Sequence, residues 1–156
     1  MIRHCPRCSS AVEMKPLGTV SAEDAPLKLT VSGMPAAQCA KGHKAPIDRD
    51  FMLWLIHELK NRGGALPGGE AKGMLFKKYQ CGACGAELAA RSEKRQSFPL
   101  ELVYQGVPAF KAELEMPLYK CTKCGKEQLR SAKELQGHTA QAVASLNDAA
   151  GFPHSG

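Results

Sequence analysis

Two cysteine pairs in the second half of the chain have the spacing of metal ligands. Cys81-Gly82-Ala83-Cys84 and Cys121-Thr122-Lys123-Cys124 each place two thiols at the ends of a four-residue segment. Such a pair binds one side of a tetrahedral ion, and a second pair closes the other side. Zn²⁺ accepts four thiolates without a change of redox state. We therefore predict a closed, structural zinc site with four ligands: Cys81, Cys84, Cys121 and Cys124.

The first half contains a similar set in which one cysteine is replaced. Cys5-Pro6-Arg7-Cys8 supplies two thiols, and Cys39 is followed by His43 rather than by a second cysteine. A histidine reaches farther than a cysteine, and sites of three cysteines and one histidine are common. We predict a second structural zinc site here, with His43 as the fourth ligand and His4 or His57 as alternatives. The expected ligands are Cys5, Cys8, Cys39 and His43.

Neither predicted site has the pattern of a catalytic centre. A catalytic zinc usually keeps one coordination position open, whereas four protein ligands can fill each of these two sites. The chain has no HExxH motif and no H-x-E…P-C-x-x-C pattern. Cys5-Pro6-Arg7-Cys8 also resembles a redox dithiol, but no parallel βαβ pattern surrounds it. We therefore expect no enzyme activity.

The cysteine usage and the beginning of the chain indicate a reduced, cytoplasmic protein. The seven cysteines are odd in number and fall mostly in CxxC pairs, which disfavours a disulfide framework. The start Met1-Ile2-Arg3-His4 lacks the apolar region of a signal peptide. The longest apolar run, from Phe51 to Ile56, is too short to cross a membrane. We expect no association with membranes.

The formal charge overstates how basic the metal-bound protein would be. The chain carries 21 Lys and Arg against 15 Asp and Glu, a formal net charge of +6. Ligating thiols are deprotonated, so the two zinc sites would carry about −2 and −1 and lower the net charge to about +3. That value is ordinary for a soluble protein and weakens an inference of nucleic-acid binding from charge.

The elements that position these ligands repeat along the chain. In the first half a half-buried strand covers Leu27 to Val31, and a helix begins near Phe51 and runs to about Asn61. In the second half a hairpin covers residues 100–118, and a capping box at Ser131 and Glu134 opens a helix to about Ala149. Each half is thus predicted as zinc knuckle, β-hairpin, zinc knuckle and helix, and a tandem duplication explains this order.

The predicted fold class is α+β, built from two small zinc-ribbon-like modules. Residues 1–62 form the first module and residues 74–156 the second. Residues 63–73 are rich in glycine and are predicted to form a flexible linker between them.

Residues 1–62 resemble the zinc-binding domain of MqsA-type antitoxins. The resemblance lies in Cys5-Pro6-Arg7-Cys8, the following strand pair, and the apolar run that leads into Cys39. In that family the zinc is structural, the domain is a protein-binding platform, and a separate helix-turn-helix domain binds DNA. Here a second zinc-binding module follows in place of the helix-turn-helix domain, so the resemblance implies a platform for protein binding.

The predicted function is that of a non-enzymatic, zinc-stabilised bacterial interaction or adaptor protein. The helix over residues 51–60 is apolar on more than one side, so Leu53 and Trp54 are expected to contact a protein partner or a second copy of the chain. The alternative is a regulatory nucleic-acid-binding zinc-ribbon protein, in which Tyr79 and Phe98 would stack on bases. The basic side chains for that role are Lys72, Lys77, Lys78, Arg91, Lys94 and Arg95.

Overall fold

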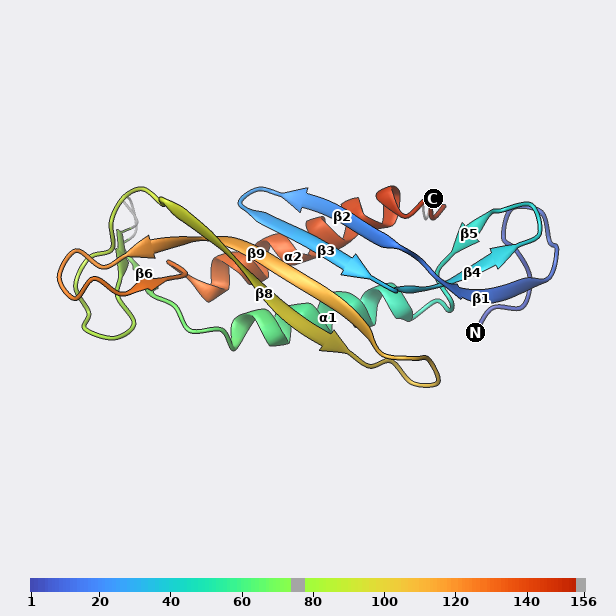
Figure 1. Ribbon diagram of the computed structural model, residues 1–156, viewed down its shortest axis with the longest axis horizontal. Helices are drawn as coiled ribbons and strands as arrows, with labels where there is room; N and C mark the ends of the chain where they lie inside the picture. The colour runs from blue at the N-terminus through green and yellow to red at the C-terminus, as the bar shows by residue number, and fades with distance from the viewer. Residues whose placement is uncertain (74–77, 154–156) are drawn as a thin grey trace.

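The protein consists of an antiparallel sheet with two helices on one face and a cysteine-rich loop cluster at each end (Figure 1). This is a computed structural model, and it describes residues 1–73 and 78–153. The α+β class predicted from the sequence is confirmed. Neither of the helices in the described part of the chain combines the length and the apolarity needed to cross a membrane.

The central sheet joins one hairpin from each half of the chain. Strands β2 (Thr19–Asp24) and β3 (Leu27–Ser32) form the first hairpin, and β8 (Lys94–Leu102) and β9 (Phe110–Lys120) form the second. The inner strands β3 and β9 pair antiparallel, from Lys28 opposite Glu115 to Ser32 opposite Lys111. The order across the sheet is therefore β2-β3-β9-β8, and the short β10 (Glu127–Gln128) pairs with the end of β9.

The alternation of side chains in the two inner strands explains why one face of this sheet is covered. Leu27, Leu29 and Val31 of β3 are buried, and so are Phe110, Ala112 and Leu114 of β9. The residues between them, such as Lys28, Thr30 and Glu113, are half-buried or exposed on the other face. A period of two residues is the expected pattern for a sheet with one solvated face.

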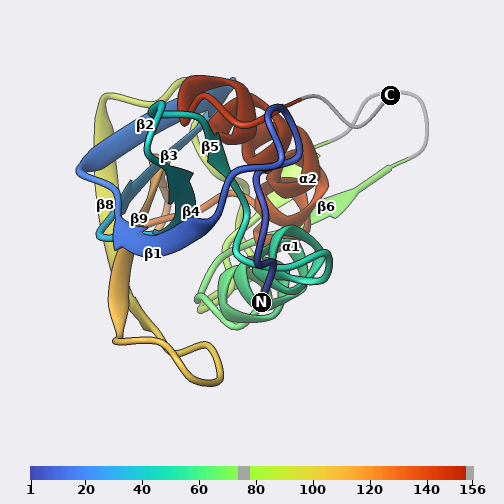
Figure 2. The ribbon, with the colours of Figure 1, turned by 90° about the vertical axis from the view of Figure 1, so that its right-hand side faces the viewer.

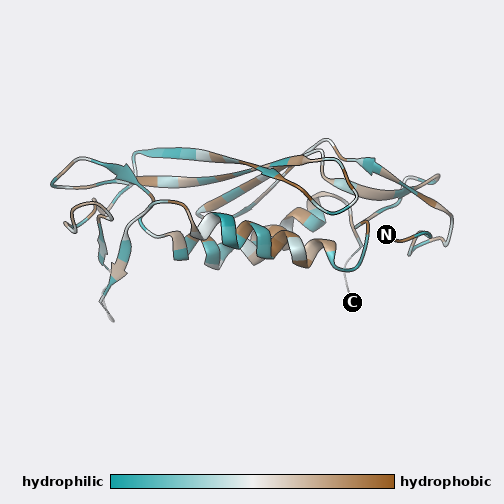
Figure 3. Cartoon of the chain, turned by 90° about the horizontal axis from the view of Figure 1, so that it is seen from below, coloured by the Kyte–Doolittle hydropathy of each residue, from teal (hydrophilic) through white to brown (hydrophobic). Residues whose placement is uncertain are grey.

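Two helices lie side by side against the buried face of the sheet (Figures 2 and 3). Helix α1 (Phe51–Gly64) buries Phe51, Leu55, Leu59 and Gly63, and α2 (Ala132–Ala149) buries a stripe from Leu135 to Leu146. The hydroxyl of Ser131 accepts the backbone N–H of Glu134, which confirms the predicted N-terminal cap of α2. Helix α1 ends at Gly64, three residues later than predicted, and Gly63 packs closely against the side chain of Leu135. A β-carbon at this position would overlap Leu135, so the glycine serves helix packing instead of ending the helix.

Smaller sheets support the loops at the two ends. Strand β4 (Pro35–Cys39) lies between β1 (Val12–Pro16) and β5 (Lys44–Ala45) at one end. At the other end β6 (Glu70–Lys72) pairs with β7 (Lys78–Gln80).

Residues 63–73 do not form the free connection that their composition suggests. Gly63 and Gly64 belong to α1, and residues 70–72 form β6. Between them, the backbone N–H of Gly69 donates to the carbonyl of Leu129 at 2.8 Å. The main hydrophobic core contains residues of both halves, from Leu17 to Phe152. The halves are thus joined by a shared sheet and a shared core as well as by the connecting segment.

Candidate metal centres

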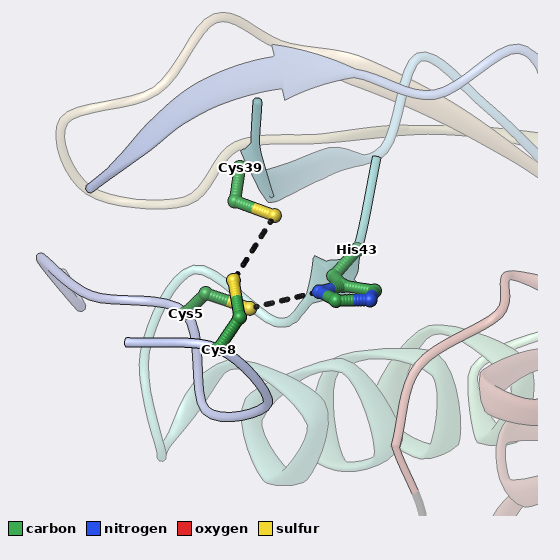
Figure 4. A group of neighbouring side chains, drawn as sticks. All are labelled: Cys5, Cys8, Cys39 and His43. Carbon is green, nitrogen blue, oxygen red and sulfur yellow. Dashed lines mark hydrogen bonds between the residues drawn. The ribbon is translucent and has the colours of Figure 1, made fainter. Parts of the chain in front are cut away.

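The first cluster contains the four residues predicted from the sequence. Cys5, Cys8, Cys39 and His43 converge from two loops, with one potential ligand atom each and all such atoms within 4.8 Å of one another (Figure 4). Cys5 Sγ lies 3.6 Å from His43 Nδ1, and Cys8 Sγ lies 3.7 Å from Cys39 Sγ. Cys5 and Cys39 are buried, and the other two residues are partly exposed. This arrangement can hold one metal ion.

The second cluster contains the other predicted set at the opposite end of the molecule. Cys81, Cys84, Cys121 and Cys124 also place their sulfur atoms within 4.8 Å of one another. The Cys84–Cys121 sulfur pair is 3.4 Å apart and the Cys81–Cys124 pair is 3.8 Å apart. Cys81 and Cys121 are buried, whereas Cys84 and Cys124 are exposed. This set can hold a second metal ion.

Three of the four ligand loops share one backbone conformation. In each, the carbonyl of the first cysteine accepts a hydrogen bond from the backbone N–H four residues later, at 2.8–3.1 Å. The residue that donates has a positive φ: 60° at Ser9, 76° at Gly85 and 77° at Gly125. The second cysteine of each pair directly precedes this residue, so the turn fixes its place, and only glycine adopts the conformation without strain.

The fourth ligand loop is one residue shorter, which explains the histidine. The N–H of Cys39 donates to the carbonyl of His43, four residues on, whereas Cys5, Cys81 and Cys121 donate to the carbonyl five residues on. The positive φ, 85°, falls on Gly42, three residues after Cys39. The residue directly before Gly42 is only two positions after Cys39, so it cannot take the place that the second cysteine has in the other loops. His43 follows Gly42 instead, and its longer side chain reaches Cys5.

Ser9 is expected to carry backbone strain that can be removed without touching a ligand. Left-handed conformation costs a non-glycine residue about 1–2 kcal/mol, partly offset in a glycine variant by a more flexible unfolded chain. Ser9→Gly is therefore expected to raise the free energy of unfolding by about 0.5–1 kcal/mol. Urea denaturation with metal in the buffer would measure this change.

The matched variant in the second cluster is expected to change the free energy of unfolding in the opposite direction. Gly85→Ser places a side chain in open space, because no atom lies within 4 Å of a β-carbon built there. It is expected to lower the free energy of unfolding by about 1 kcal/mol, through backbone strain alone. A stabilising Gly85→Ser, or a destabilising Ser9→Gly, would contradict this account of the loops.

Backbone and side-chain donors favour the thiolate form of three of the ligands. The N–H of Cys84, the side chain of Gln128 and the N–H of Ala83 lower the pKa of Cys81 to about 6. Hydrogen bonds with the hydroxyl and the backbone of Ser10 lower the pKa of Cys8 to about 6. The backbone N–H groups of Cys124 and Lys123 lower the pKa of Cys121. Metal binds the thiolate, so these donors prepare Cys8, Cys81 and Cys121 for binding. Burial raises the pKa of Cys5. The pKa of Cys124 is raised to about 11, because the hydrogen bond with the backbone of Lys126 is outweighed by the neighbouring thiol of Cys121 and by burial.

Gln128 supports the second cluster and was not found by sequence reasoning. Its Nε2 donates to Cys81 Sγ at 3.1 Å, and its Oε1 accepts the N–H of Gly82 at 2.9 Å. The residue is only 5% exposed. Groups of this kind orient metal ligands. The only signal in the sequence is a glutamine seven residues after a ligand, which is too common to be informative.

The chain was compared with family models, curated proteins and solved structures. None of them matches it. The donor atoms and their surroundings therefore carry the functional interpretation.

The other histidines in the part of the chain that the structure describes lie outside both clusters. His4 is exposed and its backbone bridges Ala11, and His57 is exposed on α1. His138 contacts the carboxylate of Asp24 at 2.8 Å. His154 lies outside the described residues. The clusters thus contain the predicted histidine, His43, and neither of its two alternatives.

Several of the side chains considered for nucleic-acid binding have partners within the protein. Lys94 pairs with Glu127 at 3.4 Å, and Arg95 pairs with Glu115 at 3.0 Å. Lys72, Lys78 and Arg91 are exposed, and Lys77 lies outside the described residues.

The two aromatic side chains considered for base stacking also have partners. The ring of Tyr79 is covered by the guanidinium of Arg130, whose central carbon lies 4.6 Å from the ring centre. Phe98 packs against the main core.

Proposed function

We propose that each cluster holds one structural zinc ion. Tetrahedral zinc with Zn–S bonds of about 2.3 Å places its sulfur ligands about 3.8 Å apart. The short sulfur–sulfur distances in the clusters are 3.4–3.8 Å. The donor sets, three thiols with an imidazole and four thiols, are those of structural zinc sites. With four protein ligands each, the sites leave no position for a substrate or a reactive water, which supports a role in stability and not in catalysis.

This assignment is expected to give two zinc ions per chain. Elemental analysis of protein purified without added metal would measure the number. His43→Ala is expected to lower it to about one, whereas the control His4→Ala is expected to leave two, because His4 lies outside the cluster. Iron in place of zinc would overturn the metal assignment, and two zinc ions in His43→Ala would overturn the ligand assignment.

We further propose that the metal-stabilised fold serves as a platform for protein binding, without enzyme activity. One observation carries this proposal: an apolar region around the first turn of α1. Among the described residues, the exposed large apolar side chains are Met1, Leu53 (57% exposed) and Val103 (67% exposed). Leu53 and Val103 lie in segments that contact each other, because their sequence neighbours Trp54 and Tyr104 are in ring contact, with centroids 4.8 Å apart. Exposed apolar surface of this kind is typical of interaction sites.

Trp54 itself is covered partly by the second half of the chain. Its ring also lies 6.2 Å from that of Phe110 and 5.7 Å from that of Phe51. Aromatic anchors supported in this way are enriched at interfaces. The resemblance of residues 1–62 to the zinc-binding domain of MqsA-type antitoxins, a protein-binding platform, supports the same role by analogy.

Leu53→Lys tests this role with little expected effect on stability. Substitutions of exposed side chains usually change the free energy of unfolding by less than about 0.5 kcal/mol, whereas Trp54→Glu would remove several ring contacts. A partner captured by the wild-type protein and identified by mass spectrometry is expected to be lost from Leu53→Lys. It is expected to be kept by Gln141→Lys, which places the same charge on an exposed site of α2. Equal capture by both variants, or complex formation that disappears with moderate salt, would contradict an apolar protein interface here.

A further inference from the structure

A groove lies between the first turns of α1 and the last turns of α2. Its volume is about 460 Å³. Met52 and Ile56 line it from α1, and Ala140, Val143 and Ala144 line it from α2. At the other ends of these helices, Gly63 packs against Leu135, and Gln136 donates to the carbonyl of Lys60 at 2.9 Å. The helices are therefore in close contact at one end and leave room at the other.

The N-terminal segment and the loop before α1 bound the open end of this groove. Ile2, His4 and Pro6 line it from the N-terminal segment, and Ala45 and Pro46 line it from the loop, which accepts the N–H of Ile2 at the carbonyl of Ile47 at 2.7 Å. Figure 2 shows the N-terminal segment running past this end of both helices. The groove is thus bounded at this end and mainly apolar, and its volume is in the range of small-molecule sites.

Arg49, at the rim of the groove, has a counterpart in the second half of the chain. Arg49 directly precedes Asp50, the N-cap of α1, and Arg130 directly precedes Ser131, the N-cap of α2. Arg130 is fully engaged: its Nε and Nη2 donate to the carboxylate of Glu134 at 2.6–3.0 Å. Its guanidinium also lies over the rings of two tyrosines.

The first half lacks the carboxylate that this arrangement uses. Glu134 is the third residue of α2, and the third residue of α1 is Leu53. Across residues 1–73 and 78–153, no carboxylate pairs with Arg49, which is exposed and faces the groove. We propose that the groove binds a small amphipathic carboxylate, whose apolar chain lies between α1 and α2 and whose carboxylate pairs with Arg49.

The acidic side chain that also lines the groove is turned to other partners. Both carboxylate oxygens of Asp48 accept the hydroxyl of Tyr104, at 3.0 and 2.8 Å, and one accepts the N–H of Asp50. Asp48 therefore does not compete with a ligand for the guanidinium of Arg49. A guanidinium binds a carboxylate in bidentate fashion, whereas an alcohol can accept only a weaker, uncharged hydrogen bond from it and a cation is repelled. This site depends neither on the identity of the metal nor on the protein-binding role.

The test uses the full-length, metal-loaded protein and decanoate as the probe. Titration followed by NMR is expected to show saturable shifts of the methyl groups of Met52, Ile56 and Val143, below the concentration at which decanoate forms micelles. Decanol and decyltrimethylammonium, which have the same chain without the negative charge, are expected to bind about tenfold more weakly. Acetate, which lacks the chain, is expected to cause no saturable shifts.

Two variants and one control test the role of Arg49. Arg49→Gln is expected to weaken decanoate binding about tenfold and to leave decanol binding unchanged. Leu53→Glu recreates the Arg130–Glu134 pair next to Arg49, so it is expected to weaken decanoate binding to a similar degree. Arg62→Gln, which removes a positive charge at the far end of α1, is expected to have no effect. Absence of saturable shifts in the groove would overturn the proposal, and so would equal affinity for decanoate and decanol in wild-type protein.

Discussion

Cys121→Ser is expected to unfold the whole chain and not only the end that contains the second cluster. That end has a small core of its own, in which the buried residues are Cys81, Leu88, Tyr119 and Cys121. Structural zinc contributes roughly 10–16 kcal/mol of apparent binding free energy in finger peptides, whereas a whole domain is stable by about 5–15 kcal/mol. Strand β9 leads directly from Cys121 into the middle of the shared sheet. Loss of the ion therefore removes support from the strand on which both halves depend.

Zinc analysis together with the dispersion of amide NMR signals would measure this effect. Both ions are expected to be lost and native signals of both halves to disappear. Thr122→Ser is the control, because it changes the neighbouring residue and retains the hydroxyl that donates to the carbonyl of Glu87. A variant that keeps one zinc ion and native signals for residues 1–62 would show that the two halves fold independently, as expected from a flexible linker.

Gly69→Ala is expected to destabilise the protein by about 3 kcal/mol, which corresponds to a decrease of roughly 6–12 °C in Tm. Gly69 lies within the segment whose composition suggests a linker. A β-carbon there would overlap the carbonyl oxygen of Gln80 and lie 3.0 Å from the carbonyl oxygen of Arg130. Both obstacles are backbone atoms, so a rotamer change cannot relieve the overlap. In a free linker the same substitution would be neutral or slightly stabilising.

Gly18→Ala is the matched control for Gly69→Ala. Gly18 lies in the turn between β1 and β2, has no positive φ, and has no atom within 4 Å of a β-carbon built there. Thermal unfolding followed by circular dichroism is expected to show little change for this variant. If Gly69→Ala were as stable as Gly18→Ala, the result would contradict the close backbone packing inferred for residues 68 and 69.

The ligand clusters were predictable because their spacing encodes local geometry. A pair such as Cys81 and Cys84 is held by its own turn, so a four-ligand set forms when two such pairs come into contact. The position of His43, one residue later than the second cysteine of the other loops, could also be predicted, because Gly42 occupies the place of that cysteine. The structure adds the physical reason, which is a turn one residue shorter with its positive φ at Gly42.

The arrangement of the two halves was not predictable from local patterns. Alternation in β3 and β9 shows that one face of each strand is buried, but it does not say which strand lies alongside. The pairing of Lys28 with Glu115 depends on contacts between residues far apart in the chain. Glycine content was ambiguous for a similar reason. Glycine permits flexibility in a linker and also permits close backbone contact, and only the surroundings of Gly63 and Gly69 distinguish the two.

The pairing of β3 with β9 has a consequence for how the protein is made on the ribosome. The first metal-ligand set is complete in the nascent chain once His43 has been synthesised, but β3 acquires its inner neighbour only when β9 has emerged. At about 5–20 residues per second, translation from residue 43 to residue 120 takes roughly 4–15 s. During that interval the apolar side chains of Leu27, Leu29 and Val31 lack strand β9 and helix α2, which contact β3 in the finished protein. Binding of the first ion at that stage would hold the two ends of the β2-β3 hairpin together until the second half of the chain has been synthesised.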